Sequence, residues 1–202
     1  MKKTESNYCS NSVPFNKFKS WFEKAKSNSK ILEPTAMSIA TINENMQPSL
    51  RMVLLKKFDQ NGFCFFTNLT SKKGRELLQN NKAALCFYWH ELGYQIRIEG
   101  SAELMTQKES DDYFSSRRRG SQIGAWASKQ SSEMSCWSDF EQRLDEVSKE
   151  FQDQEITRPP FWSGFRIVPN LIEFWQEGDY RIHKREVYYR NNKGWTIKKL
   201  YP

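Results

Sequence analysis

The chain has few residues of the kinds that build metal centres or disulfide frameworks. Its 202 residues include only two histidines and four cysteines, and no two cysteines form a C-x-x-C pair. A structural zinc site needs about four such ligands, usually closely spaced, so no metal is expected. The widely separated cysteines are typical of reduced thiols, with two of them in strand cores; they are Cys9, Cys64, Cys86 and Cys136.

Long apolar segments are missing as well. No run approaches the roughly eighteen residues of a membrane-spanning helix. The opening MKKTESNYCSNS has two lysines without an apolar run behind them, which argues against a signal peptide. These absences predict a soluble, cytoplasmic protein with no membrane partner.

Three frequent catalytic motifs are also absent. The sequence contains no G-x-x-x-x-G-K-[ST] loop and no G-x-G-x-x-G after a predicted strand, so the commonest nucleotide-binding folds are not indicated. It contains no G-x-S-x-G either, and nothing in the sequence pairs His183 with a serine or cysteine nucleophile.

The residues that are present describe an ordinary globular domain with a basic balance. Hydrophobic residues make up 38% and charged residues 27% of the chain, and the formal net charge is +7. We expect a disordered polar tail over 1–12 and a single domain over 13–202. Positive charge favours an anionic partner such as nucleic acid, an acidic membrane or a phosphorylated small molecule.

Hydrophobic periodicity predicts one helix followed by a series of strands. Phe15, Phe18, Phe22 and Ala25 recur at helical spacing after Pro14, which indicates an amphipathic helix to about residue 27. Strands at regular spacing favour an antiparallel barrel or sandwich. The β-rich runs are 35–42, 50–58, 62–69, 83–89 and 94–104.

The second half alternates between helical and strand patterns. The last two of three expected helices open with capping-box patterns, Thr106 with Glu109 and Ser138 with Glu141. The predicted fold class is therefore mainly β with flanking helices, a β-barrel covered by helices. The expected helices run over 71–79, from 106 towards 117, and from 138 up to the prolines at 159 and 160; the later strands cover 162–168, 171–176, 180–190 and 195–201.

One predicted strand carries several cations. In RIHKR, 181–185, a two-residue side-chain period places Arg181, His183 and Arg185 on one face and Lys184 on the other. Like charges side by side repel one another, so we expect this face to meet open water or an anion.

Basic and hydroxyl residues recur beside predicted strand ends and helix starts. They occur over 67–73, between Arg117 and Ser121, and at 129–131. Hydroxyls and cations at a helix N-terminus bind phosphate, so the pattern suggests two phosphate sites. Two other interpretations stay open at this point: solvated helix ends, or a nucleic-acid patch at the three consecutive arginines.

Several segments also have a familiar order and spacing over about residues 35–202. They are RMVLLK (51–56), FFTN (65–68), SKKGREL (71–77), FYWHELGYQIRIEG (87–100), YFSSRRRGSQIGAWASKQS (113–131), FWSGFRI (161–167), IEFWQ (172–176), RIHKR (181–185) and the terminal KKLYP. Together they resemble the pyridoxamine 5′-phosphate oxidase family. Collinear similarity in several motifs is far more specific than one motif alone.

The resemblance implies a split β-barrel homodimer with two FMN molecules at its interface and no nucleic-acid partner. The substrate phosphate would be held by Lys56, Tyr113, Arg117 and Ser121, and Arg181 and His183 would be the catalytic residues, contacting the pyridine ring. The implied FMN site comprises Arg51, Met52, Val53, Leu54, Leu55, Lys56, Phe66, Thr67, Lys72, Lys73, Gln95, Gln130, Ser131, Trp175 and Arg185.

The resemblance also implies the reaction. Hydride would pass from C4′ of pyridoxine or pyridoxamine 5′-phosphate to flavin N5, and dioxygen would reoxidise the flavin, giving pyridoxal 5′-phosphate, hydrogen peroxide and, from the amine, ammonia. Fixed positive charge from Arg181 and Arg185 suits a developing anionic flavin. His183 would either bind the substrate or assist proton removal.

The chain departs from the usual family sequence at four positions in or beside these motifs. Lys72 stands where the family usually has arginine, which keeps the charge but loses the bidentate fork. Arg118 replaces a common proline, Glu177 a glycine and Lys184 an aspartate. We expect such changes to bear on substrate affinity and specificity.

Two alternative functions stay open. One is that of a related flavin oxidase of phenazine biosynthesis, which shares much of the pattern and acts on another aromatic substrate. Retention of the four phosphate contacts favours the vitamin B6 substrate instead. The other alternative is a flavin- or nucleic-acid-binding split barrel without catalysis.

Overall fold

The computed structural model describes residues 8–10 and 12–202, and their strands join in one antiparallel sheet. The helices are α1 (Val13–Ser27), α2 (Lys72–Gln79), α3 (Gln107–Ser115), α4 (Arg119–Ala127) and α5 (Trp137–Glu150), with 3-10 turns η1 (His90–Leu92) and η2 (Asp179–Arg181). The strands are β1 (Tyr8–Cys9), β2 (Ala36–Ile42), β3 (Pro48–Leu54), β4 (Lys57–Asp59), β5 (Gly62–Asn68), β6 (Lys82–Trp89), β7 (Tyr94–Leu104), β8 (Trp162–Gln176), β9 (Lys184–Asn191) and β10 (Gly194–Leu200). The predicted fold class is confirmed. The predicted tail over 1–12 lies largely outside the described residues.

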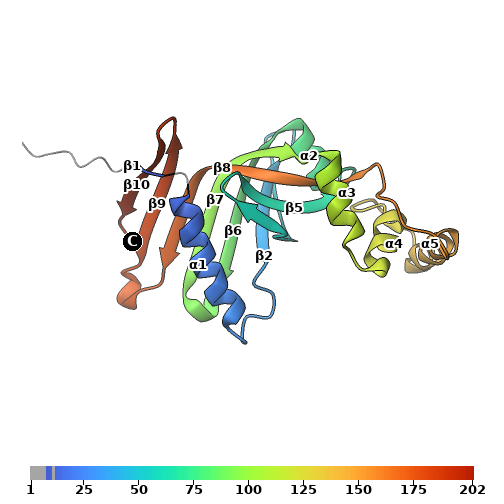
Figure 1. Ribbon diagram of the computed structural model, residues 1–202, viewed down its shortest axis with the longest axis horizontal. Coiled ribbons are helices and arrows are strands. Elements are labelled where there is room, and N and C mark those ends of the chain that lie inside the picture. The colour runs from blue at the N-terminus through green and yellow to red at the C-terminus, as the bar shows by residue number, and fades with distance from the viewer. Residues whose placement is uncertain (1–7, 11) are drawn as a thin grey trace, which may run out of the picture.

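Strand β8 divides the sheet into two parts. Strand β7 pairs along one edge of β8, while the other edge is shared, with 162–167 pairing with β5 and 171–176 with β9. The main path is β1-β10-β9-β8-β7-β6-β2-β3, and β5 joins β8 beside it. Figure 1 shows β9 and β10 at one end of the molecule and the helices α3 to α5 at the other.

The curvature of the sheet depends on Gly100 in β7. The pairing register between β7 and β8 shifts between Glu99 and Gly100. A Cβ atom on Gly100 would lie 2.2 Å from the carbonyl oxygen of Val168, so a larger residue would push the strands apart. Glycine therefore permits the bulge that bends the strand pair.

Helix α1 packs its aromatic face into the curved sheet. The fully buried ring of Phe18 makes edge-on contacts with Phe58, Phe63 and Phe87, at centroid distances of 4.7, 4.8 and 5.2 Å. Burying one such side chain stabilises a fold by about 1.5–3 kcal/mol. The predicted helix to residue 27 is confirmed.

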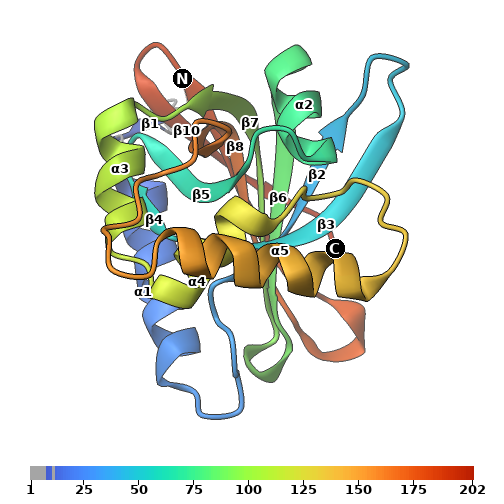
Figure 2. The same cartoon turned by 90° about the vertical axis from the view of Figure 1, so that its right-hand side faces the viewer.

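A smaller apolar cluster lies under the helices of the other end. Its buried members are Phe114, Phe151, Ile156 and Trp162. Since Trp162 is the first residue of β8, the cluster joins these helices to the strand that divides the sheet. Figure 2 shows α5 crossing this end of the molecule next to α4.

The predicted strand over 50–58 is wrong as a single strand. The Leu55 N–H donates to the carbonyl of Thr35 (2.9 Å), whereas the Lys56 N–H donates to the carbonyl of Cys64 (2.8 Å). The chain therefore changes partners at this point, leaving the β2 side for β5. Lys56 lies at the resulting junction between β3 and β4.

The C-terminal strands also differ from the prediction. The runs 162–168 and 171–176 form the single strand β8, and β9 begins only at Lys184. Tyr180 and Arg181 have φ values of 54° and 64°, which an extended strand does not allow. A turn therefore stands where 180–183 was predicted as strand.

Helix α4 has no counterpart in the sequence prediction, because two glycines and a basic start weaken its apolar pattern. The helix predicted to run towards Arg117 is α3, which ends at Ser115. The three arginines take separate places: Arg117 follows α3, Arg118 is the N-cap of α4, and Arg119 donates to the carbonyl oxygens of residues 151, 152 and 154 after α5.

The capping box predicted at Ser138 is wrong, whereas the one at Thr106 is confirmed. Helix α5 begins at Trp137, and its N-cap Cys136 makes no side-chain capping bond. The helix ends at Glu150, well before the prolines at 159 and 160. Tertiary contacts with α4, and not local capping, hold it in place.

Arg118→Pro is expected to stabilise the chain by about 0.4–1 kcal/mol. Arg118 has φ −57°, close to the value that proline imposes, and its N–H donates no hydrogen bond within the described residues. Urea denaturation measures the change in the free energy of unfolding. Arg118→Ala is the control, with an expected change below about 0.5 kcal/mol; a less stable proline variant would contradict the argument.

Candidate functional site

A cavity of about 440 Å³ opens between β5 and the helices α3 and α4. The four predicted phosphate-binding residues all line it, together with three further members of the predicted flavin set. Residues far apart in the sequence therefore meet at one place, at the end of the molecule that carries the small apolar cluster. The lining residues are Lys56, Phe66, Thr67, Asn68, Tyr113, Arg117, Ser121, Gly124, Ala125, Ser128, Gln130, Phe140 and Trp162.

Arg117 lines this cavity, and one nitrogen of its guanidinium is unsatisfied. Its Cζ lies 4.8 Å from the ring centre of Trp162 and 5.5 Å from that of Phe114, so aromatic faces hold the side chain. Its Nη1 is buried and has no hydrogen-bond partner in the described part of the chain. Burial lowers the pKa of Arg117, although arginine stays charged. An anionic ligand would satisfy this donor.

Lys73 is a buried cation, and none of the described carboxylates pairs with it. Its Nζ lies 3.1 Å from Thr67 Oγ1, 3.3 Å from Ser71 Oγ and 3.2 Å from Gln130 Oε1. Ser71 caps α2 by accepting from the Gly74 N–H at 3.2 Å, which fixes the start of the helix beneath Lys73. Hydroxyl and amide groups thus surround a charge that still lacks a counter-ion.

Arg51, in contrast, is paired with a buried carboxylate. Its Nη2 donates to Glu76 Oε2 at 3.3 Å and to Ser49 Oγ at 2.6 Å. Burial raises the pKa of Glu76, but hydrogen bonds from Thr41 and Ser49 and the charge of Arg51 lower it overall. Burial, followed by repulsion from Arg51, lowers the pKa of Lys73 to about 8, while Glu76 acts in the opposite direction.

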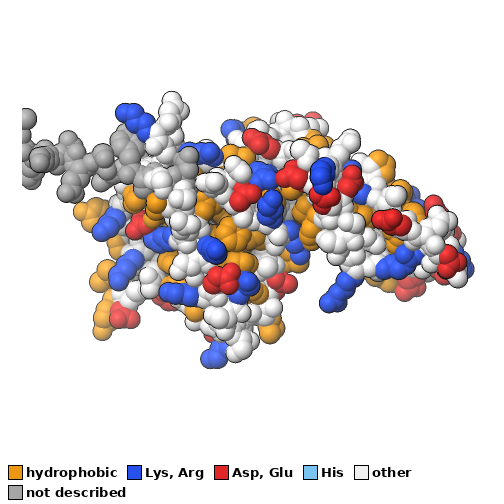
Figure 3. Space-filling view, in the orientation of Figure 1, with side chains coloured by type: hydrophobic (Ala, Val, Ile, Leu, Met, Phe, Trp, Pro, Cys, Tyr) orange, Lys and Arg blue, Asp and Glu red, His pale blue; other side chains and the backbone are white. Residues whose placement is uncertain are grey.

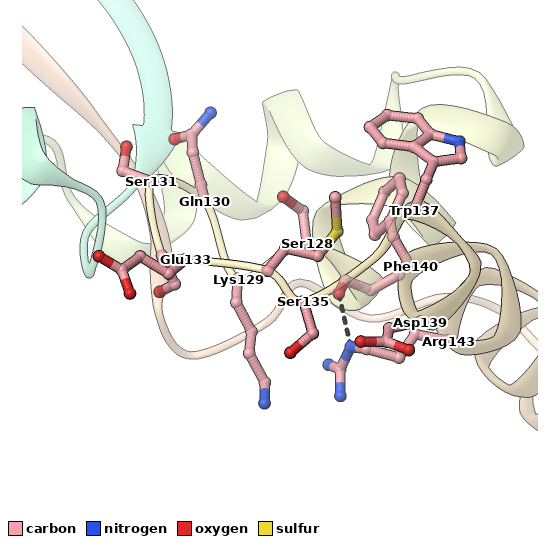
Figure 4. A pocket seen from close by; sticks show the side chains of 13 residues that line it. Ser128, Lys129, Gln130, Ser131, Glu133, Ser135, Trp137, Asp139, Phe140 and Arg143 are labelled. Atoms are coloured by element: carbon pink, nitrogen blue, oxygen red, sulfur yellow. Dashed lines mark hydrogen bonds between the residues drawn. The ribbon is translucent and has the colours of Figure 1, made fainter.

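Lys72 and Ser131 lie at the exposed rim of this region. Ser131 has φ 69°, in the loop between α4 and α5. Figure 4 shows Gln130 and Ser131 on one side and Trp137 on the other side of a second cavity of about 470 Å³, which all three residues line. Arg143 anchors the loop by donating from Nε to the carbonyl of Ala127 at 2.9 Å.

A row of predicted flavin residues lies on the sheet face that α1 leaves uncovered. Gln95 pairs with Trp175 across β7 and β8, and Trp175 pairs with Arg185 across β8 and β9. Directly paired residues point to the same face, so the three side chains form one row. The Arg185 Nε donates to Glu173 Oε1 at 2.7 Å, which raises the pKa of Arg185.

Arg181 and His183 do not share a strand face with Arg185, which corrects the interpretation of RIHKR. Arg181 lies in the exposed turn η2, before β9 begins. His183 reaches the row through other contacts, because its ring lies 4.5 Å from that of Trp175 and its Nδ1 accepts from the Gly178 N–H at 3.3 Å.

The predicted residues 51–54 alternate along β3, the last strand of the sheet path, and Leu55 follows its end. Arg51 and Val53 are half-buried and Leu55 is buried, whereas Met52 and Leu54 are 62% and 37% exposed. Apolar side chains exposed on an edge strand are typical of a surface that another molecule covers.

Apart from residues 51–55 on and just after β3, most of the predicted site residues form two groups in one copy of the chain. The cavity lies beside α3 and α4, whereas the row of Gln95, Trp175 and Arg185 lies on β7 to β9. Figure 1 shows these elements towards opposite ends of the molecule.

Sequence reasoning missed the residues that hold the predicted ones in place. Trp162 supports Arg117, and the buried carboxylates Glu76 and Glu173 bind Arg51 and Arg185. The available signals were weak: a carboxylate three residues after Lys73 on a helix, and another two residues before Trp175 on a strand.

Among the described residues, no group of three or more His, Cys, Asp or Glu side chains is placed to hold a metal ion. Within the same part of the chain, no helix is both long and apolar enough to cross a membrane.

The sheet that divides at β8 and the cationic cavity beside it define a split β-barrel protein. The structure is similar to that of PhzG from Burkholderia lata 383, solved with tetrahydrophenazine-1-carboxylic acid, with TM-score 0.88 and 31% identity over 94% of this chain and 92% of the other. It also shares its fold with a pyridoxamine 5′-phosphate oxidase-related, FMN-binding protein from Nostoc punctiforme, with TM-score 0.75 and 16% identity over 94% and 98% of the two chains.

The chain belongs to the pyridoxamine 5′-phosphate oxidase family. Residues 24–149 match the family model of that name, and residues 162–202 match the pyridoxine 5′-phosphate oxidase C-terminal dimerisation region. The pyridoxine/pyridoxamine 5′-phosphate oxidase of Wolbachia pipientis wMel is 50% identical over 94% of this chain and 88% of its own length. That of Myxococcus xanthus strain DK1622 is 48% identical over 94% and 91%.

Gly178→Ala is expected to displace His183. A Cβ atom at this position would lie 2.2 Å from the carbonyl oxygen of Ile182, so the turn must open and release the Nδ1 of His183. The chain has only two histidines, so imidazole NMR signals report His183 directly, with His90, which bonds Tyr88 at 3.0 Å, as the internal reference. Unchanged His183 signals in the variant would show that the turn does not position the ring.

Proposed function

We propose that this chain oxidises pyridoxamine 5′-phosphate and pyridoxine 5′-phosphate to pyridoxal 5′-phosphate, using FMN and dioxygen and releasing hydrogen peroxide. The observation that carries the proposal is the convergence of Lys56, Tyr113, Arg117 and Ser121 on one cavity in which Arg117 Nη1 has no partner. The names of the curated relatives support the same substrate and reaction.

The residues present fit FMN. A flavin phosphate would supply the missing counter-ion of Lys73, next to Thr67, Gln130 and the exposed Lys72. The isoalloxazine ring would lie against the row of Gln95, Trp175 and Arg185. The cavity and this row belong to different ends of one chain, so we propose that FMN binds where two copies meet.

A homodimer would complete both sites. The match of residues 162–202 to a dimerisation region supports this arrangement. The exposed row of Leu50, Met52 and Leu54 on β3 offers apolar surface for the partner copy. In the dimer, the cavity of one copy would face the row and the η2 turn of the other.

FMN, when bound, supplies hydride acceptance from substrate C4′ and the return of electrons to dioxygen. Arg117 and Lys56 hold the substrate phosphate, and the partially buried Tyr113 closes the cavity around it by stacking on Phe66 at 3.9 Å. These contacts would orient the substrate in the site.

His183 is assigned a binding role by its second nitrogen. Because Nδ1 accepts from the Gly178 N–H, the proton of the neutral ring lies on Nε2. In this tautomer His183 would offer Nε2 to the substrate as a hydrogen-bond donor and not as a base. Arg181, held in the exposed turn, adds positive charge beside the substrate ring.

The nucleic-acid alternative has less support. On the face that Figure 3 shows, lysine and arginine side chains lie among aspartate and glutamate and form no continuous basic patch. Arg119, one of the three consecutive arginines, caps the end of α5 by donating to the carbonyl oxygens of residues 151, 152 and 154.

An oxidase assay tests the function. The purified protein loaded with FMN is expected to be yellow and to form pyridoxal 5′-phosphate and peroxide in air from both phosphorylated substrates. Unphosphorylated pyridoxamine is the matched control and should react poorly, because it leaves Arg117 without an anion. A protein that does not bind FMN would refute the proposal, and a yellow protein inert towards both phosphates would favour a phenazine-type substrate.

FMN affinity is expected to fall as the pH rises above about 8. The pKa of Lys73 in the ligand-free chain is lowered to about 8, and a bound phosphate favours the charged form, so binding above this pH must take up a proton. The dissociation constant should then rise by up to about tenfold per pH unit, measured by flavin fluorescence between pH 7 and 9.5.

Riboflavin, which lacks the phosphate, is the control ligand, and Lys73→Met is the control variant; the affinity should not show this pH dependence in either case.

The lowered pKa of Lys73 also makes the stability of the ligand-free chain depend on pH. The pKa of Lys73 in the folded chain lies below its ordinary 10.5, so unfolding takes up a proton, and the Lys73 contribution to the free energy of unfolding rises between about pH 8 and 10.5. Equal pH profiles for FMN and riboflavin would contradict the role of Lys73.

A further inference from the structure

Glu173 is a carboxylate buried near the C-terminal end of β8, between two arginines. It is 3% exposed and lies on the sheet face opposite the main core. Its Oε1 accepts from Arg185 Nε at 2.7 Å, and its Oε2 accepts from Arg97 Nη1 at 3.1 Å. A buried charge is retained cheaply only where such partners compensate its lost hydration.

The geometry fixes the orientation of Arg185. The residue of β9 directly opposite Glu173 is Val187, so Glu173 reaches Arg185 along the diagonal of the strand pair. Arg185 Nη1 donates to the carbonyl of Tyr201 at 3.3 Å, which adds a second fixed point. Two bonds set the plane of the guanidinium, and Nη2 is the group that no described residue binds.

The two arginines depend on Glu173 to different degrees. Arg97 has a second carboxylate, because its Nη2 donates to Glu99 Oε1 at 3.0 Å. Arg185 has Glu173 as its only carboxylate partner among the described residues. Loss of Glu173 would therefore leave Arg97 paired and Arg185 held by one carbonyl alone.

We propose that Glu173 is a positioning residue for the flavin site: it holds the Arg185 guanidinium in the plane that presents Nη2 to FMN, without contacting FMN itself. The proposal rests on the proposed function, in which Arg185 contacts the flavin. It explains why an acid is buried in the strand that carries Trp175, two residues further on.

A double-mutant cycle on the full-length protein tests this role. Glu173→Gln keeps the shape of the side chain and is expected to raise the FMN dissociation constant about tenfold, as for loss of a hydrogen bond to a charged group. In an Arg185→Met background the same substitution should change it less than about threefold, because the group through which Glu173 acts is already gone.

Glu99→Gln is the matched control. It also removes a carboxylate bound to Arg97 but does not touch Arg185, so the FMN dissociation constant should stay within about twofold of the wild type. Binding is measured at least 20 °C below each variant's own midpoint of thermal unfolding, which separates positioning from stability.

Glu173→Asp covers the case in which the glutamine variant does not fold. It keeps the buried charge but withdraws the oxygen from Arg185 Nε, so weaker FMN binding is again expected. An Asp variant with wild-type affinity, or a Gln effect of equal size with and without Arg185, would overturn the proposal. If the wild type itself binds no FMN, the proposed function fails instead, and the two failures are thereby distinguished.

Discussion

A β-strand has only two edges, and the architecture of this protein follows from how β8 uses them. Strand β7 occupies one edge of β8, while β5 and β9 share the other. The first half of β8 pairs with β5 in the barrel, and the second half pairs with β9, which in turn pairs with β10. The helices α3 to α5 pack against Trp162, where the strand begins, and Glu173 and Trp175 lie where it ends. One strand thus connects the cationic cavity with the aromatic row.

The buried and half-buried cations of the proposed site divide into two kinds, and the difference has functional meaning. Arg51 and Arg185 each have a buried carboxylate, so their positions are settled before any ligand arrives. Lys73 and Arg117 have hydroxyl, amide or aromatic neighbours in place of an acid. A cation buried without a counter-ion costs stability unless a ligand supplies it. Paired cations keep the geometry of the proposed FMN site, and unpaired cations provide its affinity for phosphate.

Local pattern and tertiary contact contributed unequally to what could be predicted. The helix of Phe15 to Ala25 and the capping box at Thr106 depend on residues near in sequence, and both were predicted correctly. Helix α4 depends on burial against Phe114, so its own glycine-containing sequence did not predict a helix there. The strand predicted through Arg181 failed because left-handed backbone at Tyr180 and Arg181 stops the period of two. The residue set implied by the family resemblance stays a prediction, although the cavity brings seven of its members together.

The sequence alone determined the mainly β class and the family, because alternation, turn residues and collinear motifs are properties of neighbouring residues. It also indicated phosphate as the ligand chemistry, through cations and hydroxyls at helix starts. Only the tertiary structure decided which cations have acids as partners, since Glu76 lies 25 residues from Arg51 and Glu173 lies 12 residues from Arg185. Only the tertiary structure, too, showed that the turn before β9 places the His183 ring against Trp175. The position of a side chain after a turn follows from backbone angles, which the periodicity of a sequence does not encode.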